Sequence, residues 1–224
     1  MRHGIYICPA EGSELSRLAA NWLGRDANGN EPREQPDVDG IAKLTASPRR
    51  YGFHGTVVAP FRLAEGCFVN ELQDALAAFC DGERGFAVRL AIGRLGPFFA
   101  LVPAVPSAEL NALASRAVRH FHPFRAEPTA AETARRRADA LTPRQREMLE
   151  RWHYPHVHDE FRYHMTLTGA VPEDDRDRME AALHHHFDAA LEQPFAIDAL
   201  ARYEEREPGA DFVVAERFPF RVSP

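Results

Sequence analysis

The sequence predicts an α+β protein built from two similar lobes with a groove between them, and three observations indicate this fold. The chain of 224 residues is 45% hydrophobic and 27% charged, which is typical of a globular protein with a buried core. The order strand, helix, strand, strand occurs twice along it. A His-x-Thr motif stands at the same place in each repeat, at His54 to Thr56 and at His164 to Thr166. Residues 1–224 are therefore expected to form a single bilobal domain.

The N-terminal segment, residues 1–24, is expected to form a strand and a helix. Aliphatic residues alternate with Tyr6 in the strand. Apolar residues then recur at helical spacing between Ser13, a good N-cap residue, and Gly24, a good C-cap residue. Residues 25–47 are polar and contain several Gly and Pro, so a loop is expected there.

The two repeats contain matching elements, and each repeat begins with the strand that carries the motif. The first repeat, residues 50–105, is expected to contain a strand at 51–59, a helix around 69–79 and strands at 86–92 and 98–102. The second repeat, residues 159–220, is expected to contain a strand at 161–168, a helix at 172–191 and strands at 195–201 and 212–217.

Residues 106–158 are expected to connect the two repeats. Apolar residues at helical spacing predict a helix over 110–121, and residues 127–152, rich in Ala, Arg and Glu, predict a helical surface insertion or connector. Three consecutive arginines, residues 135–137, offer a nucleic-acid interpretation. Acidic residues stand close by, so a solvated charged face is the favoured interpretation.

Strand alternation places the polar residues of each motif on one face. Side chains two positions apart in a strand point the same way, so His54 lies beside Thr56, and His164 beside Thr166. The opposite face of both strands is apolar, as expected of strands backed by helices. Its residues are Phe53, Val57 and Ala59 in the first copy and Tyr163, Met165 and Leu167 in the second.

If the two lobes pack about a pseudo-twofold axis, the motifs offer two imidazoles and two hydroxyls to one bound group. A phosphodiester suits this set, because displacement at phosphorus needs one proton taken from the incoming oxygen and another given to the leaving oxygen. Two histidines can divide these tasks near neutral pH, and threonine hydroxyls can donate hydrogen bonds to the other phosphate oxygens. A single His-x-Thr is common by chance, so the inference depends on the duplication.

The sequence resembles the 2H phosphoesterase superfamily, and specifically its bacterial branch of phosphonate metabolism proteins (DUF1045-like). The matching text covers Trp-Leu-Gly-Arg-Asp at 22–26, Arg-Arg-Tyr-Gly-Phe-His-Gly-Thr at 49–56, Ala-Pro-Phe at 59–61, and Asp-Glu-Phe-Arg-Tyr-His-Met-Thr-Leu-Thr-Gly at 159–169. This text is more specific than the short His-x-Thr pattern. The resemblance as a whole extends over nearly the whole chain.

The resemblance implies a fold, a site and a class of substrate. It implies two antiparallel sheets flanked by helices, a catalytic groove between them, and neither a metal nor another cofactor. It implies His54, Thr56, His164 and Thr166 as the active-site residues. Relatives in the superfamily act on 2′,3′-cyclic or 2′,5′-linked phosphodiesters, and this branch is associated with phosphonate breakdown, where ribose cyclic phosphates arise.

Alternation suggests two further substrate-binding residues, Arg162 and Tyr6. Arg162 shares the face of His164 and could neutralise a phosphate, although a surface ion pair would explain it equally well. Tyr6 points away from Ile5 and Ile7, and packing at the lobe interface is the alternative for its ring.

A metal site is the main alternative for the eleven histidines of the chain. His153, His156 and His158 stand close together, but Pro155 interrupts them and no carboxylate helix motif accompanies them. The run at 184–186 lies in the expected helix, where consecutive side chains diverge by about 100°. A catalytic metal is therefore not the favoured interpretation.

Two other functions stay open at this point. The groove could bind a nucleotide or an RNA end without cleaving it, or the chain could be a 2′,5′-RNA ligase or phosphodiesterase. The 33 acidic residues against 27 Lys and Arg give a net charge of −6, which argues against a long nucleic acid as partner. The expected partner is a small phosphorylated molecule, derived from ribose or a nucleotide.

Cysteine use and hydropathy indicate the compartment. The three cysteines, Cys8, Cys67 and Cys80, are odd in number and have no C-x-x-C spacing, so reduced thiols are expected. No apolar stretch approaches the roughly 20 residues of a membrane span. A cytoplasmic protein without a membrane partner is expected.

Overall fold

A single antiparallel sheet forms the centre of the protein. The computed structural model describes residues 1–135 and 141–221. The sheet has seven strands in the order β11-β10-β1-β4-β8-β7-β6, and every neighbouring pair is antiparallel. Its strands are β1 (Arg2–Ile7), β4 (Gly55–Phe61), β6 (Leu90–Leu95), β7 (Phe98–Pro103), β8 (Met165–Thr166), β10 (Ala199–Glu205) and β11 (Val213–Pro219). The protein is thus α+β as expected, with one large sheet where two separate sheets were expected.

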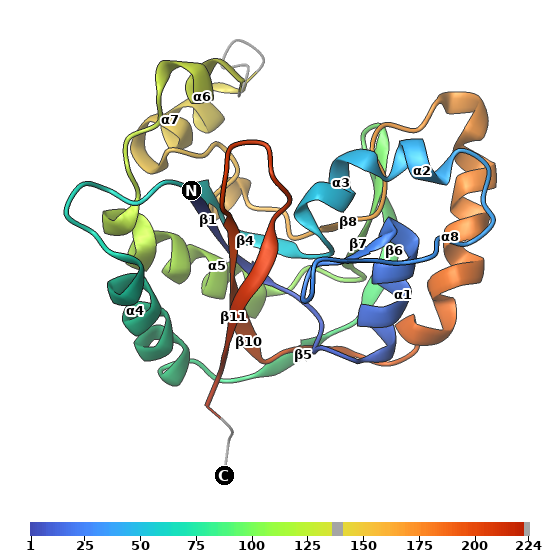
Figure 1. Cartoon of the computed structure of the whole chain (residues 1–224), viewed down its shortest axis with the longest axis horizontal. Coiled ribbons are helices and arrows are strands. Elements are labelled where there is room, and N and C mark those ends of the chain that lie inside the picture. The colour runs from blue at the N-terminus through green and yellow to red at the C-terminus, as the bar shows by residue number, and fades with distance from the viewer. Residues whose placement is uncertain (136–140, 222–224) are drawn as a thin grey trace.

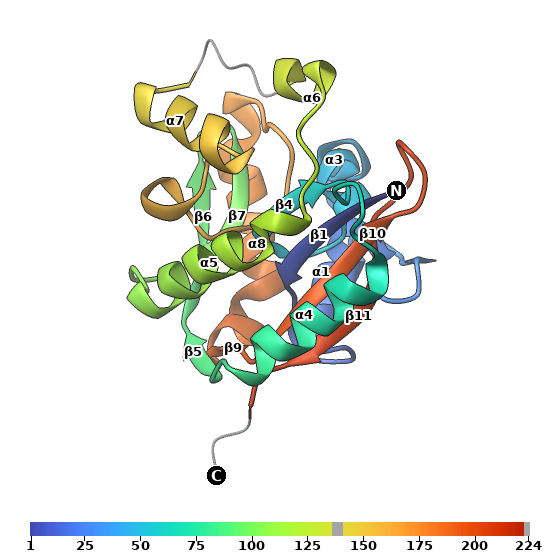
Figure 2. The same cartoon turned by 90° about the vertical axis from the view of Figure 1, so that its left-hand side faces the viewer.

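Helices pack on both halves of the sheet (Figures 1 and 2). The larger helices are α1 (Glu14–Leu23), α4 (Val69–Asp81), α5 (Ala108–Phe121), α7 (Pro143–Trp152) and α8 (Arg176–Leu191). In the β11-β10-β1-β4 half, α4 packs on β10 and β11 and α5 packs on β4, while in the other half α8 packs on β6 and α1 packs on α8. No helix of the described residues is long and apolar enough to cross a membrane.

The two sequence repeats exchange their hairpins. The hairpin β6–β7 follows the first motif in the chain, but it pairs with β8, the strand of the second motif. The hairpin β10–β11 follows the second motif, but it pairs with β1, which in turn pairs with β4. Each half of the sheet therefore contains strands from both repeats.

A second, two-stranded sheet joins the repeats again. Strand β5 (Phe86–Val88) pairs with β9 (Phe195–Ile197), with Ala87 opposite Ala196. These are the matching segments Phe-Ala-Val and Phe-Ala-Ile of the two repeats. In this pair, as at Gly55 and Met165, residues at the same position of the two repeats face each other.

The N-terminal helix forms as its sequence predicts. Ser13 caps α1 by accepting a hydrogen bond from the backbone N–H of Ser16 (3.3 Å), and Gly24 ends it at a φ of 76°. Its apolar stripe is buried, and the Trp22 indole donates a hydrogen bond to the carbonyl of Leu167 (3.0 Å). This bond ties α1 to the second motif strand.

The segment before the first motif contains more structure than expected. The predicted loop at 25–47 contains two short strands and the helix α2, and the predicted strand at 51–59 starts only at Gly55. The short elements are β2 (Arg25–Asp26), β3 (Glu31–Pro32), α2 (Ile41–Leu44) and α3 (Ala46–Tyr51). The buried Arg25 guanidinium donates to the carbonyls of Arg49, Arg50 and Phe212 at 2.7–3.0 Å. These long-range bonds, which no local pattern encodes, fix the end of α3.

The strand predicted at 161–168 is much shorter than expected. Only Met165 and Thr166 are in β8, because the neighbouring strand β4 meets it at one residue pair. The backbone N–H groups of Leu167 and Thr168 both donate to the carbonyl of Phe99, which ends regular pairing. The predicted alternation is nevertheless present, since Tyr163, Met165 and Leu167 are buried.

Two further boundaries differ from expectation. The predicted strands at 86–92 and 195–201 are each divided in two, so that β5 pairs with β9 while β6 and β10 enter the large sheet. The helix predicted at 172–191 begins with a 3₁₀ turn at Glu173–Asp175. The helical insertion at 127–152 contains α6 (Ala130–Arg135) and α7, and Arg136 and Arg137 of the arginine run lie outside the described residues.

We expect Gly55→Ala to destabilise the protein by about 1–3 kcal/mol, because an added methyl group in a packed site forces its neighbours to move. A Cβ atom at Gly55 would lie 2.3 Å from the ring of Tyr163. Gly85→Ala is the matched control, since its nearest contact would be an ordinary 3.6 Å. Urea unfolding measures both, and equal unfolding free energies would contradict this account.

Candidate functional site

The two motifs meet at the centre of the sheet. Gly55 and Met165, the middle residues of the motifs, pair directly with each other in the antiparallel register. Counting outward from this pair places His54 opposite Thr166 and Thr56 opposite His164. Directly opposite side chains on one face of such a pair have Cβ atoms about 4.5–5.5 Å apart, and diagonal ones about 7–8 Å. The two imidazoles are therefore diagonal neighbours, each flanked by a threonine of the other motif.

Both histidines are oriented by the same backbone contact. Nδ1 of His54 lies 2.9 Å from the carbonyl oxygen of Gly52, and Nδ1 of His164 lies 2.7 Å from that of Arg162. A carbonyl oxygen only accepts hydrogen bonds, so Nδ1 carries the proton in both rings. In the neutral form of each ring, Nε2 is then a free base.

Aromatic rings surround His54. Its ring stacks on Tyr6 with centroids 4.0 Å apart and planes 25° apart, and Tyr203 and Tyr51 lie at 5.9 and 6.1 Å. Nε2 lies 3.1 Å from the hydroxyl of Thr56. The pKa of His54 is lowered to about 4, chiefly by burial, with a smaller contribution from the neighbouring His164, while the bond to Gly52 acts in the opposite direction. The imidazole of His54 is therefore neutral at pH 7.

His164 lies in a more open environment. Its ring has one aromatic neighbour among the described residues, Phe98, at 5.9 Å. It borders a hollow that also contains His156, Glu160 and Arg162. The two copies of the motif thus have different neighbours, although their backbone contacts are the same.

A groove of about 460 Å³ runs along the motifs, and a hollow of about 310 Å³ adjoins it. His54 and Thr166 line the groove, His164 lines the hollow, and Thr56 and Tyr154 line both. Further groove residues are Arg2, Ser47, Pro48, Tyr51, Phe98, Thr168 and Gly169. The volume suits a small molecule.

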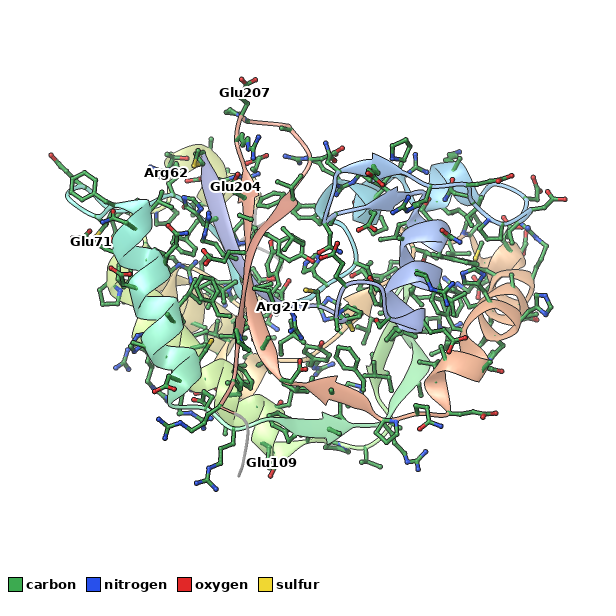
Figure 3. The ribbon with its side chains drawn as sticks, turned by 60° about the horizontal axis from the view of Figure 1, so that its bottom comes forward. Arg62, Glu71, Glu109, Glu204, Glu207 and Arg217 are labelled. Atoms are coloured by element: carbon green, nitrogen blue, oxygen red, sulfur yellow. The ribbon has the colours of Figure 1, made fainter. Side chains whose placement is uncertain are left out.

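An ion-pair network supports one side of the groove. The buried carboxylate of Glu205 on β10 binds both Arg2, which lines the groove, and Arg50. Although burial alone would raise it, hydrogen bonds from Arg2 and from the backbone of Gly209 keep the pKa of Glu205 low. Figure 3 shows Glu204, the residue next to Glu205, on the same hairpin that carries Glu207 at its tip. The network ties this hairpin to β1 and α3.

The structure brings all four motif residues together, and it places Arg162 and Tyr6 beside them. Arg162 is exposed in the hollow next to His164. Tyr6 is fully buried beneath the groove against His54, because the ring also packs on Tyr203. Both therefore remain candidates, Arg162 for substrate contact and Tyr6 for holding His54.

Sequence reasoning missed several groove residues. Tyr51 was expected in a strand, and Tyr154 lies in the connector, where no periodicity marks it. Arg2 and Phe98 reach the groove only through long-range strand pairing. The resemblance gave the one available signal, because Tyr51 lies inside the matching text at 49–56.

The other histidines form contacts of their own. His153 binds Glu127 at 3.2 Å, His158 binds the hydroxyl of Ser115 at 2.7 Å, and His156 faces the hollow. On α8, His184 binds Asp188 and His186 binds the carbonyl of Leu18. Within residues 1–135 and 141–221, no three His, Cys, Asp or Glu side chains are grouped as metal ligands.

Comparisons with known proteins give two similar bacterial sequences. The ribose 1,5-bisphosphate phosphokinase PhnN of Janthinobacterium sp. (strain Marseille) is 39% identical over 229 residues, which cover 98% of this chain and 51% of that protein. The protein of the same name from Laribacter hongkongensis (strain HLHK9) is 35% identical over 214 residues, 95% of this chain and 50% of that protein. The chain spans about half the length of these curated relatives.

Two further comparisons concern a solved structure and a protein family. The crystal structure of a conserved protein of unknown function, ATU0111 from Agrobacterium tumefaciens str. C58, aligns with 95% of this chain and 83% of that chain, at a TM-score of 0.46 and 13% identity. Residues 56–213, which include the second motif and most of the first repeat, match the family described as "Protein of unknown function (DUF1045)". The chain belongs to this DUF1045 family.

Proposed function

We propose that this protein hydrolyses a small cyclic phosphodiester, with His54 and His164 as the general base and general acid. The observation that carries the proposal is the direct pairing of Gly55 with Met165. It sets two imidazoles and two hydroxyls on one face of the sheet, beside a groove of suitable size. Each Nδ1 is bound to a carbonyl, so Nε2 is the nitrogen of each ring that can exchange a proton, and at His54 it does so beside the hydroxyl of Thr56 (3.1 Å).

In the proposed reaction, one histidine takes a proton from water as the water oxygen bonds to phosphorus. The bond from phosphorus to one ring oxygen of the cyclic diester breaks, and the other histidine gives its proton to that oxygen. Thr56 and Thr166 donate hydrogen bonds to the non-bridging oxygens, where charge shifts during the displacement. The products are a phosphomonoester and a free hydroxyl group.

The environments of the two histidines suggest how they divide the roles. His54 is enclosed by Tyr6 and Tyr203 and is neutral at pH 7, so it is the proposed base. His164, in the open hollow, is the proposed acid. An anionic phosphate in the groove would favour the charged form of His54 and so strengthen it as a base when substrate is bound.

The names of the relatives suggest the substrate. The relatives are named for a phosphokinase of ribose 1,5-bisphosphate, and this chain corresponds to half of their length. A phosphate-binding loop of the Gly-x-x-x-x-Gly-Lys-Ser/Thr type is absent from the chain, whose single lysine, Lys43, follows Ala42. We therefore assign the kinase reaction to the other half of the relatives.

The proposed substrate is the 1,2-cyclic phosphate of ribose 5-phosphate. Hydrolysis of the bond between phosphorus and O2 of this cyclic diester gives ribose 1,5-bisphosphate, the compound in the relatives' name. This substrate fits a role in phosphonate breakdown.

We expect His54→Ala and His164→Ala each to lower kcat for ribose cyclic phosphates by about 10²- to 10⁴-fold, since each removes a general acid or base. His185→Ala, on the exposed face of α8, is the matched control and should retain full activity. Conversion of the diester to a phosphomonoester, followed by phosphorus NMR over a panel of ribose cyclic phosphates and 2′,5′-dinucleotides, measures this. Wild-type activity should also survive exhaustive chelation. A wild-type protein that binds these compounds without turnover would contradict the proposal.

The pH profile of kcat/KM should be bell-shaped, with its acidic limb near pH 4. This limb reports the free enzyme, in which His54 has a pKa of about 4 and loses its basic form below that pH. Tyr6→Leu opens His54 to water, so its pKa should rise toward 6.5 and the limb should move to higher pH. Phe98→Leu, which alters the surroundings of His164, should leave the acidic limb in place. A profile that rises monotonically through pH 9 would rule out the proposed division of roles.

We expect the purified chain to transfer no phosphate from ATP to ribose 1,5-bisphosphate. The reason is that the sequence lacks the loop with which many nucleotide-dependent enzymes hold the transferred phosphate. ADP formation, followed with and without the sugar, measures this, and opening of the cyclic diester by the same preparation is the positive control. Sugar-dependent ADP formation would show that the kinase assignment is wrong.

A further inference from the structure

The hollow beside the catalytic groove has the features of an anion-binding site. It lies next to His164, so a group bound there would be close to the reacting phosphorus. It opens to solvent and shares Thr56 and Tyr154 with the groove. Its polar side chains come from two segments, Gln145 on α7 and the stretch from His156 to Arg162 before β8.

Arg162 is the main cation of the hollow. Its side chain is exposed, and no ion pair or side-chain hydrogen bond joins its guanidinium to another described residue. Arg2, the arginine that lines the groove itself, differs in that Glu205 already neutralises it. Arg162 is therefore the arginine with charge left for a ligand.

His156 adds a hydrogen-bonding side chain to the hollow. The ring of His156 packs edge-on against Tyr154 at 5.6 Å. Burial lowers the pKa of His156, and His164 and Arg162 lower it further, while Glu160 raises it. The imidazole of His156 is therefore neutral at pH 7, and it offers an anion an N–H donor beside Arg162 in the lining of the hollow.

One acidic residue faces the same hollow. The carboxylate of Glu160 accepts a hydrogen bond from the side-chain amide of Gln145 (2.9 Å). It opposes anion binding and leaves the hollow only moderately positive. An exposed site of this kind suits a phosphomonoester held by one arginine and reversible hydrogen bonds.

We propose that Arg162 and His156, with Gln145 beside them, bind a second phosphate of the substrate, a phosphomonoester on the sugar whose cyclic phosphate lies between the motifs. This inference rests on the proposed function and adds a specificity determinant to it. A ribose that carries phosphate at both ends needs a cation away from the reacting group. Arg162 meets this need, because it lies in the hollow that adjoins the groove.

The test compares two substrates and two arginine variants. Ribose 1,2-cyclic phosphate is assayed with and without a 5-phosphate, in wild type, Arg162→Gln and Arg94→Gln. Arg94 is the matched control, an exposed arginine on β6 that lines neither the groove nor the hollow. Wild type should prefer the 5-phosphate, and Arg162→Gln should lower the ratio of the two kcat/KM values by about 10- to 100-fold, the effect of losing one charged hydrogen bond. Arg162→Lys should restore part of the ratio, and Arg94→Gln should keep it.

Binding separates this inference from the proposed function. Calorimetric titration with ribose 5-phosphate should show at least tenfold weaker affinity in Arg162→Gln than in wild type and Arg94→Gln, whether or not any diester is cleaved. Failure of wild type to open either diester would contradict the proposed function alone. An unchanged substrate ratio or equal ribose 5-phosphate affinity in Arg162→Gln would overturn the second-phosphate site.

Discussion

The direct pairing of Gly55 with Met165 is the contact on which the rest of the site depends. It is the one register pair of β4 and β8 in the described residues, and it joins the two halves of the sheet. The pair can form because Gly55 has no side chain and the ring of Tyr163 occupies that space. Since side chains alternate along strands, this single pair sets both imidazoles on the same face.

One residue pair is a small contact, and the exchange of hairpins strengthens it. The hairpin β6–β7 of the first repeat extends the sheet beyond β8, and β10–β11 of the second extends it beyond β1. Helices follow the same exchange, with α4 on β10 and β11 and α8 on β6. Neither repeat can bury its apolar face alone, so separation of the motifs would expose the core of both. The geometry of the site is thus stabilised by packing far from it.

The face on which each site residue lies was predictable from the sequence, whereas the distant segments that pack against these residues were not. Alternation correctly placed Tyr163, Met165 and Leu167 in the core, because the direction of a side chain depends on the strand that carries it. In the hairpin exchange, each hairpin pairs with a strand that is distant in sequence, and hydrophobic periodicity does not predict which strand this is. Tyr6 illustrates the limit, since alternation gave its face but not the second small core, with Tyr203 and Phe212, that buries it there.

The difference between the two histidines follows from these unpredicted contacts. Two identical motifs related by symmetry would give two identical imidazoles, whereas acid-base catalysis needs one neutral and one protonated ring. The backbone contacts at Nδ1 are the same in both copies, so the motif itself is not the source of the asymmetry. The asymmetry comes from the neighbours, because Tyr6 stacks on His54 whereas an open hollow lies beside His164. Duplication supplies the pair of groups, and divergence of the surroundings gives each group its proposed role.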